Sequence, residues 1–139
     1  MTVCSAGKIR YFGKIISETM KLNPLGNIAY TELARIPERW QHLDVDLFVV
    51  MPNHLHIIVL IYEPEREIKY KPTLANIIGS YKAGVTRTAR QMDLITSDRI
   101  LWQERYHDHI IRNEKRLNIL RQYIATNPAR WAEDKFYSE

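Results

Sequence analysis

The chain has 139 residues, of which 45% are hydrophobic and 26% are charged, and its formal net charge is +4. These values are ordinary for a globular protein, and we expect one domain over residues 1–139 with a core of its own. No apolar run in the sequence reaches about 18 residues, so a transmembrane helix is excluded. The positive charge favours polyanionic partners only weakly.

The compartment is indicated by what the N-terminal region lacks. A single cysteine, Cys4, cannot form an internal disulfide, and the first residues contain no apolar segment typical of a secretory signal. We therefore expect a cytoplasmic protein that does not act at a membrane.

The first half of the chain predicts strands, a helix and a hairpin. Residues 1–5 and 11–21 have strand character. Asn23 is suited to a helix N-cap and Pro24 to the first helical position. Apolar residues then recur at helical spacing, at Leu25, Ile28, Ala29, Leu33, Ile36 and Trp40. The stretches LDVDLFVVM (43–51) and HLHIIVLIY (54–62) predict two strands joined by a short turn.

The second half predicts two further helices with a strand between them. A charged linker over 63–72 precedes a helix that begins at Thr73. The apolar face of this helix contains Leu74, Ile77, Ile78, Tyr81 and Val85. Residues 100–112 predict a strand in their C-terminal half. A last helix begins after Asn113, and Pro128 ends or kinks it.

From Tyr11 onward the expected order is therefore β-α-β-β-α-β, followed by one more helix. This order predicts an α+β fold of the ferredoxin-like, split βαβ type. Its antiparallel sheet carries helices on one face, and the extra C-terminal helix carries Tyr123.

Two histidines in the second hairpin strand are the first candidate site. His54 and His56 share one face of the strand because side chains two apart point the same way. The opposite face is aliphatic, so the strand is expected to be covered on both sides. A buried imidazole needs a partner. The pair therefore predicts a metal site, an anion site or a hydrogen-bonding network, and a structural pair that caps the hairpin is the alternative.

The H-x-H pattern is unspecific, since the chain contains it twice. The second copy is His107-Asp108-His109, among basic and aromatic residues. For this copy a polar surface or a sheet-edge segment is the favoured interpretation.

The last helix offers a tyrosine and an amide beside its apolar stripe. Tyr123 and Asn127 lie one turn apart at the border of that stripe. Tyr123 could pack in the core with its hydroxyl at the rim. Asn127 could be the N-cap of a further helix that begins at Pro128. The stripe itself is formed by Leu117, Leu120 and Ile124.

Basic residues gather on the helix that begins at Thr73. Lys82 and Arg90 lie on one face, with Arg87 beside them. Such a face is either solvated or, together with Arg105 and Arg112, a track for phosphate groups. Trp102 is expected in the core rather than as a base-stacking platform.

Three stretches, taken together and in this order, resemble the single-tyrosine HUH transposases. They are VVMPNHLHIIVLI (49–61), LWQERYHDHIIRNE (101–114) and RQYIATNPARW (121–131). The REP-associated tyrosine transposases and their insertion-sequence relatives are the most similar members. The resemblance implies a DNA strand transferase with endonuclease activity. Such an enzyme moves mobile elements by cleaving and rejoining single-stranded DNA through a 5′-phosphotyrosine intermediate.

The resemblance also implies roles for individual residues. In that family an H-x-H pair binds a divalent metal, a tyrosine on a late helix is the nucleophile, and a Gln or Asn four residues later completes the metal site. These roles fall on His54, His56, Tyr123 and Asn127. Mg or Mn is the implied cofactor, and single-stranded or hairpin DNA is the implied partner. Family members act as homodimers, in which the tyrosine helix serves the partner's histidines, or as monomers, and both states stay open.

A non-catalytic nucleic-acid-binding module, or a degenerate and domesticated transposase copy, is the alternative function. RNA-recognition motifs place exposed aromatic residues on their central strands, whereas the strands here offer aliphatic residues and histidines. A histidine-triad nucleotide hydrolase is excluded, because the position of its third histidine holds Ile58.

Overall fold

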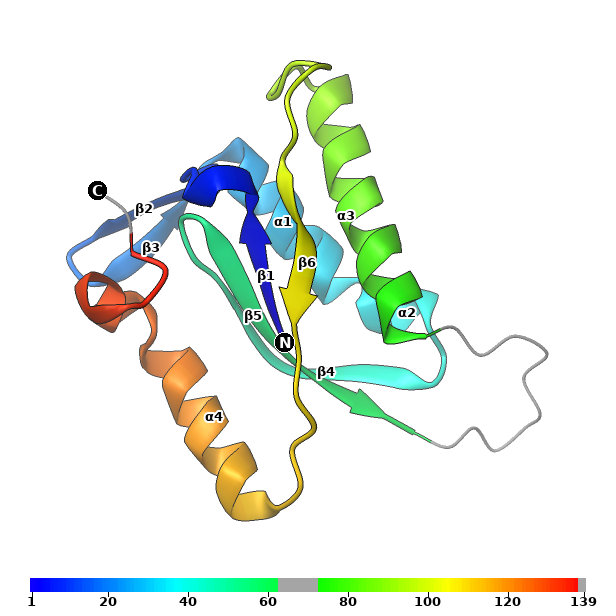
Figure 1. The fold of residues 1–139 in the computed structure, drawn as a ribbon, viewed down its shortest axis with the longest axis vertical. Coiled ribbons are helices and arrows are strands. Elements are labelled where there is room, and N and C mark those ends of the chain that lie inside the picture. The colour runs from blue at the N-terminus through cyan, green and yellow to red at the C-terminus, as the bar shows by residue number, and fades with distance from the viewer. Residues whose placement is uncertain (63–72, 138–139) are drawn as a thin grey trace.

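The computed structural model describes residues 1–62 and 73–137, so the linker expected at 63–72 lies outside the described residues. Four strands form the main sheet in the order β4-β5-β1-β6 (Figure 1). Each neighbouring pair is antiparallel. The strands are β1 (Thr2–Ser5), β4 (Leu43–Val50), β5 (His54–Ile61) and β6 (Trp102–His107).

The first strand of this sheet is β1, and the expectation that residues 11–21 supply it was wrong. Those residues form a separate two-stranded sheet of β2 (Gly13–Ile16) and β3 (Thr19–Leu22). The chain reverses between them at Ser17 and Glu18, which both have positive φ, as in the tight turns that match strand twist. The reversal leaves two short strands, and β1 takes the central place between β5 and β6.

The helices begin within a residue of where the sequence predicted, and the N-cap expected at Asn23 is confirmed. Asn23 accepts a hydrogen bond from the Gly26 N–H at 2.8 Å, and Thr73 and Asn113 cap two further helices in the same way. The expected helix over 25–40 is divided at Arg35, because Pro37 has no N–H to continue the helical hydrogen bonds. The helices are α1 (Pro24–Ala34), α2 (Ile36–Arg39), α3 (Leu74–Gln91) and α4 (Glu114–Thr126), with short 3₁₀ turns η1 (Ala6–Lys8) and η2 (Pro128–Glu133).

The order β1-α1-β4-β5-α3-β6 confirms the ferredoxin-like arrangement, with the β2–β3 hairpin inserted before α1. The helices α1 and α3 pack against each other and against one face of the sheet (Figure 1). The extra helix α4 lies apart from them, near β4 and β5. No helix among the described residues has the length and apolar character needed to cross a membrane.

Strand β6 occupies the N-terminal half of residues 100–112 and not the C-terminal half that the sequence predicted. Its register explains the difference. His107 pairs with Thr2, which is the first residue of the antiparallel strand β1. Beyond His107, β6 therefore has no further residue of β1 to pair with. The apolar Ile110 therefore lies in a loop, where it is 75% exposed.

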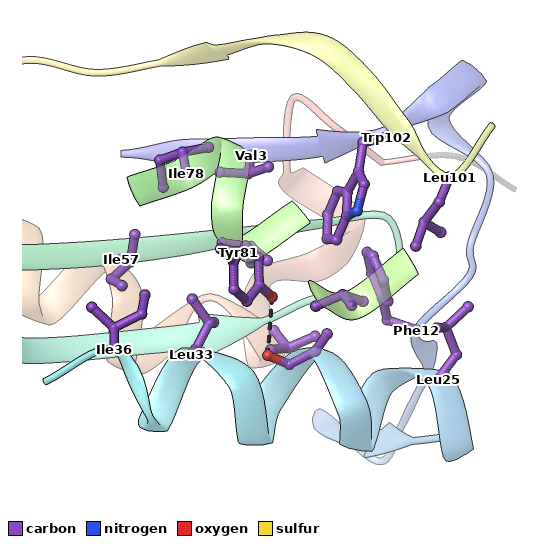
Figure 2. Close-up of a cluster of buried hydrophobic side chains, with 14 of the residues drawn as sticks. Val3, Phe12, Leu25, Leu33, Ile36, Ile57, Ile78, Tyr81, Leu101 and Trp102 are labelled. Carbon is purple, nitrogen blue, oxygen red and sulfur yellow. Dashed lines mark hydrogen bonds between the residues drawn. The ribbon is translucent and has the colours of Figure 1, made fainter. Parts of the chain in front are cut away.

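The core lies between the sheet and the α1–α3 pair (Figure 2). Tyr81 of α3 is buried and donates a hydrogen bond from its hydroxyl to the Ala29 carbonyl of α1 at 2.9 Å. Trp102 is a core residue, as expected, and its ring centroid lies 5.3 Å from that of Phe12 and 5.7 Å from that of Tyr81. These contacts fix β6 and α3 against α1.

Two helical glycines provide a matched test of this packing. A Cβ at Gly26 would overlap the Phe12 carbonyl oxygen and approach Leu22 Cδ2 to 3.0 Å, whereas a Cβ at Gly79 would meet nothing within 4 Å. We predict that Gly79→Ala raises the free energy of unfolding by about 0.5–1 kcal/mol, because alanine favours the helix. Gly26→Ala should lower it by about 1–3 kcal/mol, as overpacking does. Urea unfolding of both variants measures the difference, and equal effects would contradict the close approach at Gly26.

Candidate active site

Strand β5 divides its side chains between two environments. Leu55 and Ile57 point into the core with α1 and α3, so His54 and His56 point to the opposite face. Both histidines are buried there, with exposures of 0% and 6%. Their ring centroids are 4.8 Å apart. The sequence prediction of two adjacent buried imidazoles is therefore correct in its geometry.

The side chain of Asn53 determines the tautomer of His54. Asn53 Oδ1 lies 2.8 Å from His54 Nδ1, and Asn53 Nδ2 donates to the carbonyl of Phe136 at 2.7 Å. That second bond fixes the amide with its oxygen toward the ring. Since an amide oxygen only accepts, His54 Nδ1 carries the proton and Nε2 offers its lone pair. Asn53 thus fixes the tautomer and the ring orientation of His54, as hydrogen-bond partners do for histidines that bind metal ions.

His56 is held by strand β1. The Thr2 hydroxyl lies 2.8 Å from His56 Nδ1, and the two residues are register partners. Burial is the main cause that lowers the pKa of His56 to about 3, and the neighbouring His54 adds to it. Burial also lowers the pKa of His54, against the opposing influence of Asp134 and Asn127. Both imidazoles are therefore neutral at neutral pH, which is the state that binds metal ions.

Asp134 joins the pair, and the sequence analysis did not find it. Its Oδ2 lies 3.6 Å from His54 Nε2, and its side chain is 1% exposed. One ligand atom from each of His54, His56 and Asp134 lies within 4.8 Å of the others. The turn η2 brings Asp134 to the histidines after α4 has ended, and no local motif around this residue marks it in the sequence.

Asn127 also faces the site. It is 2% exposed and follows α4, and its side chain makes no capping hydrogen bond to η2. Asn127 is thus the N-cap residue of a turn that begins at Pro128, as the alternative interpretation held, but its side chain takes no part in the cap. The backbone of Asn127 serves the turn instead, because its carbonyl accepts from the Arg130 N–H at 3.1 Å.

Four buried polar atoms of this site find no hydrogen-bond partner within residues 1–62 and 73–137. They are His54 Nε2, His56 Nε2, Asn127 Oδ1 and Asp134 Oδ2. Each unpaired buried group costs about 1–3 kcal/mol. Two imidazole nitrogens, an amide oxygen and a carboxylate oxygen form a donor set suited to a divalent cation. The residues present therefore fit a metal ion.

Tyr123 lies at the edge of this group. Its ring centroid is 5.3 Å from that of His56, and 38% of the residue is exposed. The expected position, with a packed ring and a hydroxyl near the histidines, is compatible with this contact. Partial burial, and next the Asp134 carboxylate, raise the pKa of Tyr123, while Asn127 lowers it.

A groove of about 850 Å³ opens beside Tyr123 and His56. It is lined by residues of β5 and α4 and of the segment between β6 and α4. Arg112 and Arg116 line it together with His107 and His109. The second H-x-H pair is exposed at the end of the edge strand β6, as expected.

The remaining basic candidates are distributed over two other surfaces. Lys82, Arg87 and Arg90 line a shallow, open hollow of about 470 Å³ between α3 and Trp102. Lys82 Nζ donates to the Gln103 carbonyl at 2.8 Å and so contacts β6. Arg105 is exposed on β6 itself. The other four candidates therefore do not share the groove that Arg112 lines.

The fold has a counterpart among solved structures. It matches the structure of a REP-associated tyrosine transposase bound to a REP hairpin, with a TM-score of 0.64 over 93% of this chain. The two sequences are 16% identical, so the likeness concerns the fold. The chain spans 64% of the length of that solved chain. The two proteins thus share a fold, and in this chain Asp134 lies beside His54 and His56 of the central strand β5.

The sequence has a close relative. A Haemophilus influenzae (strain ATCC 51907 / DSM 11121 / KW20 / Rd) protein, described as uncharacterized, is 36% identical over 152 residues. The alignment covers 99% of this chain and 83% of the relative. The chain belongs to the same family as this Haemophilus protein. None of the known protein-family models matches the chain.

We predict that Mn²⁺ binds at the four unpaired atoms and raises the unfolding temperature. A cation at about one hundred times its Kd stabilises the folded state by about 2.7 kcal/mol. The double variant His54→Ala, His56→Ala should lose this shift. Asp134→Asn should weaken it, because it removes the anionic donor. Thermal unfolding with and without Mn²⁺ measures the effect.

The second H-x-H pair supplies the matched control. His107→Ala with His109→Ala removes two histidines at the same spacing from an exposed segment. This variant should keep the full shift. A shift that survives in the first double variant would place the cation elsewhere.

Proposed function

We propose that the chain is a metal-dependent enzyme that cleaves and rejoins single-stranded DNA, with Tyr123 as the nucleophile. One observation carries the proposal. The ring of Tyr123 lies against His56, beside four buried donor atoms that have no partner within the described residues. A tyrosine that adjoins a cation site is the arrangement needed for transfer of a phosphoryl group to a phenol.

In the proposed step, Tyr123 Oη attacks the scissile phosphorus. The Oη–P bond forms and the bond from phosphorus to the 3′-oxygen breaks. The phenolic proton passes to solvent, and the departing 3′-oxygen takes a proton from solvent to become a hydroxyl. The enzyme then carries a 5′-phosphotyrosine. Attack by a 3′-hydroxyl reverses the step, and because one phosphate ester replaces another, rejoining needs no ATP.

The other residues of the site prepare this attack. Burial raises the pKa of Tyr123, so the phenol needs positive charge or hydrogen bonds to act as an oxyanion. His54, His56, Asn127 and Asp134 would hold a divalent ion such as Mg²⁺ or Mn²⁺. That ion would supply the positive charge and polarise the phosphate. Asn53 and Thr2 keep the two imidazoles oriented.

We further propose that unpaired nucleotides enter along the groove that contains Tyr123. Arg112 lies on this groove and would contact phosphate. Lys82, Arg87, Arg90 and Arg105 would contact the backbone of a single-stranded or hairpin substrate elsewhere. Such contacts add affinity without reading sequence.

Tyr123→Phe tests the proposal. It removes only the hydroxyl, so the fold should persist while cleavage is lost. Wild-type protein, incubated with Mn²⁺ and a single-stranded oligonucleotide that carries a hairpin, should form a denaturant-resistant adduct. The adduct should be labelled only when the tracer lies 3′ of the nick. Denaturing gel electrophoresis measures both results.

Two results would contradict the mechanism. An adduct formed by Tyr123→Phe would mean that another residue is the nucleophile. Cleavage without any adduct in the wild-type protein would mean that water attacks. Tyr62→Phe is the matched control, since Tyr62 is exposed at the end of β5 and should keep full adduct formation.

The basic face of α3 has a test of its own. We predict that Arg87→Ala with Arg90→Ala weakens binding to all single-stranded DNA sequences alike. Each lost phosphate contact should reduce the salt dependence by about 0.7 unit of slope. Fluorescence anisotropy titrations at several salt concentrations measure this slope.

A charge-matched control separates contact from net charge. Lys14→Ala with Lys21→Ala removes the same charge from the separate β2–β3 hairpin. It should leave the slope nearly unchanged. Equal slopes in both double variants would show that the α3 face is merely solvated.

A further inference from the structure

The helix that carries Tyr123 is joined to the sheet by a bidentate ion pair between Arg121 and Asp46. Arg121 Nε donates to Asp46 Oδ2 at 2.8 Å, and Arg121 Nη2 donates to Asp46 Oδ1 at 2.7 Å. Parallel hydrogen bonds of this kind fix direction as well as distance. Arg121 Nη1 also donates to Asn118 Oδ1, one turn earlier on α4, at 3.2 Å. The guanidinium is therefore held from both elements.

The backbone of β4 places Asp46 for this contact. Val45 pairs with Val59 and Leu47 pairs with Ile58, so Asp46 is an extra residue in the strand. Such a bulge redirects a side chain and bends the strand locally. The Arg121 guanidinium lowers the pKa of Asp46, which keeps the carboxylate ionised. The pair therefore depends on a specific irregularity and not on a chance meeting of surface charges.

Apolar packing alone gives α4 little hold on the sheet. The structure describes all 13 residues of α4, and Ile124 is the one fully buried residue among them. A helix held by so little buried surface can rotate or slide. Arg121 precedes Tyr123 by two residues, so any rotation that breaks the ion pair also moves the phenol relative to His56.

We propose that the Asp46–Arg121 pair is a positioning clamp, which fixes α4 on the sheet of its own chain so that Tyr123 works with the histidines of the same chain. The clamp itself is independent of the proposed function, whereas its catalytic consequence rests on it. Asp46 and Arg121 are positioning residues, because neither one touches the four donor atoms. The active unit is then one chain, whether or not the protein associates.

Hydrogen exchange tests the clamp without DNA or metal. Asp46→Asn and Arg121→Gln should each accelerate amide exchange in residues 114–126 several-fold. Both should leave exchange in α1 and α3 unchanged, since the partly exposed pair lies outside the core that holds these two helices. Lys115→Gln, an exposed cation on the same helix, is the matched control. Unchanged exchange in both clamp variants would overturn the proposal.

Single-turnover kinetics tests the consequence for catalysis. At saturating DNA, each clamp variant should form the Tyr123 adduct about ten- to a hundredfold more slowly, as a small misplacement of a reacting group does. The Kd for DNA should stay unchanged. The double variant Asp46→Asn, Arg121→Gln should be no slower than the slower single variant, because both changes break one contact. Arg121→Lys should be intermediate, since lysine cannot form the paired contact.

Additive losses in the double variant, or a loss of DNA affinity with an unchanged rate, would overturn the clamp as a positioning device.

A mixture of two inactive variants decides whether Tyr123 acts within its own chain. Tyr123→Phe mixed with His56→Ala should form no adduct, and recovery of the adduct would show that α4 serves a partner chain. If the wild-type protein forms no adduct, the proposed function fails, while hydrogen exchange still decides the clamp.

Discussion

The alternation of side chains along β5 is the constraint on which the rest of the structure depends. Leu55 and Ile57 must face α1 and α3 to complete the core, so His54 and His56 must face the other way. A shift of one residue in register would exchange the two sets and bury imidazoles among aliphatic side chains. The hydrophobic effect that holds the sheet to its helices therefore also fixes the histidines on the opposite face. Core and site share one strand, and the core determines where the site lies.

The second face of β5 needs its own cover, and residues 114–137 supply it. Helix α4 brings the ring of Tyr123 against His56, and the segment after it brings the rings of Trp131 and Phe136 near His54, at centroid distances of 6.1 and 4.6 Å. This cover buries the site and yet leaves four polar atoms unpaired within the described residues. Unpaired buried polar atoms cost free energy, so a purely structural cluster would be expected to pair them with one another. These unpaired atoms fit the proposed binding of a cation.

Polar contacts also hold this cover in place. Asn53 connects His54 to the carbonyl of Phe136, and the Asp46–Arg121 pair connects β4 to α4. Directional bonds suit the proposed function, because the proposed nucleophile and metal ligands would have to be placed to within a fraction of an ångström. The core between the sheet and α1–α3 supplies most of the buried apolar surface. The opposite face positions the residues of the candidate site. The two faces of one sheet thus serve stability and chemistry separately.

Local signals in the sequence determined the caps, the hairpin and the helical face of α3. Asn23, Thr73 and Asn113 cap helices through short-range hydrogen bonds, and apolar periodicity reports which side is buried, so neither depends on distant residues. The same periodicity placed His54 and His56 side by side. What local signals could not decide was which strand pairs with which. The central place of β1 and the early end of β6 follow from register between distant segments. Likewise, only the tertiary structure brought Asp134 to His54 and Arg121 to Asp46, because contacts between distant residues leave no mark on their sequence neighbours.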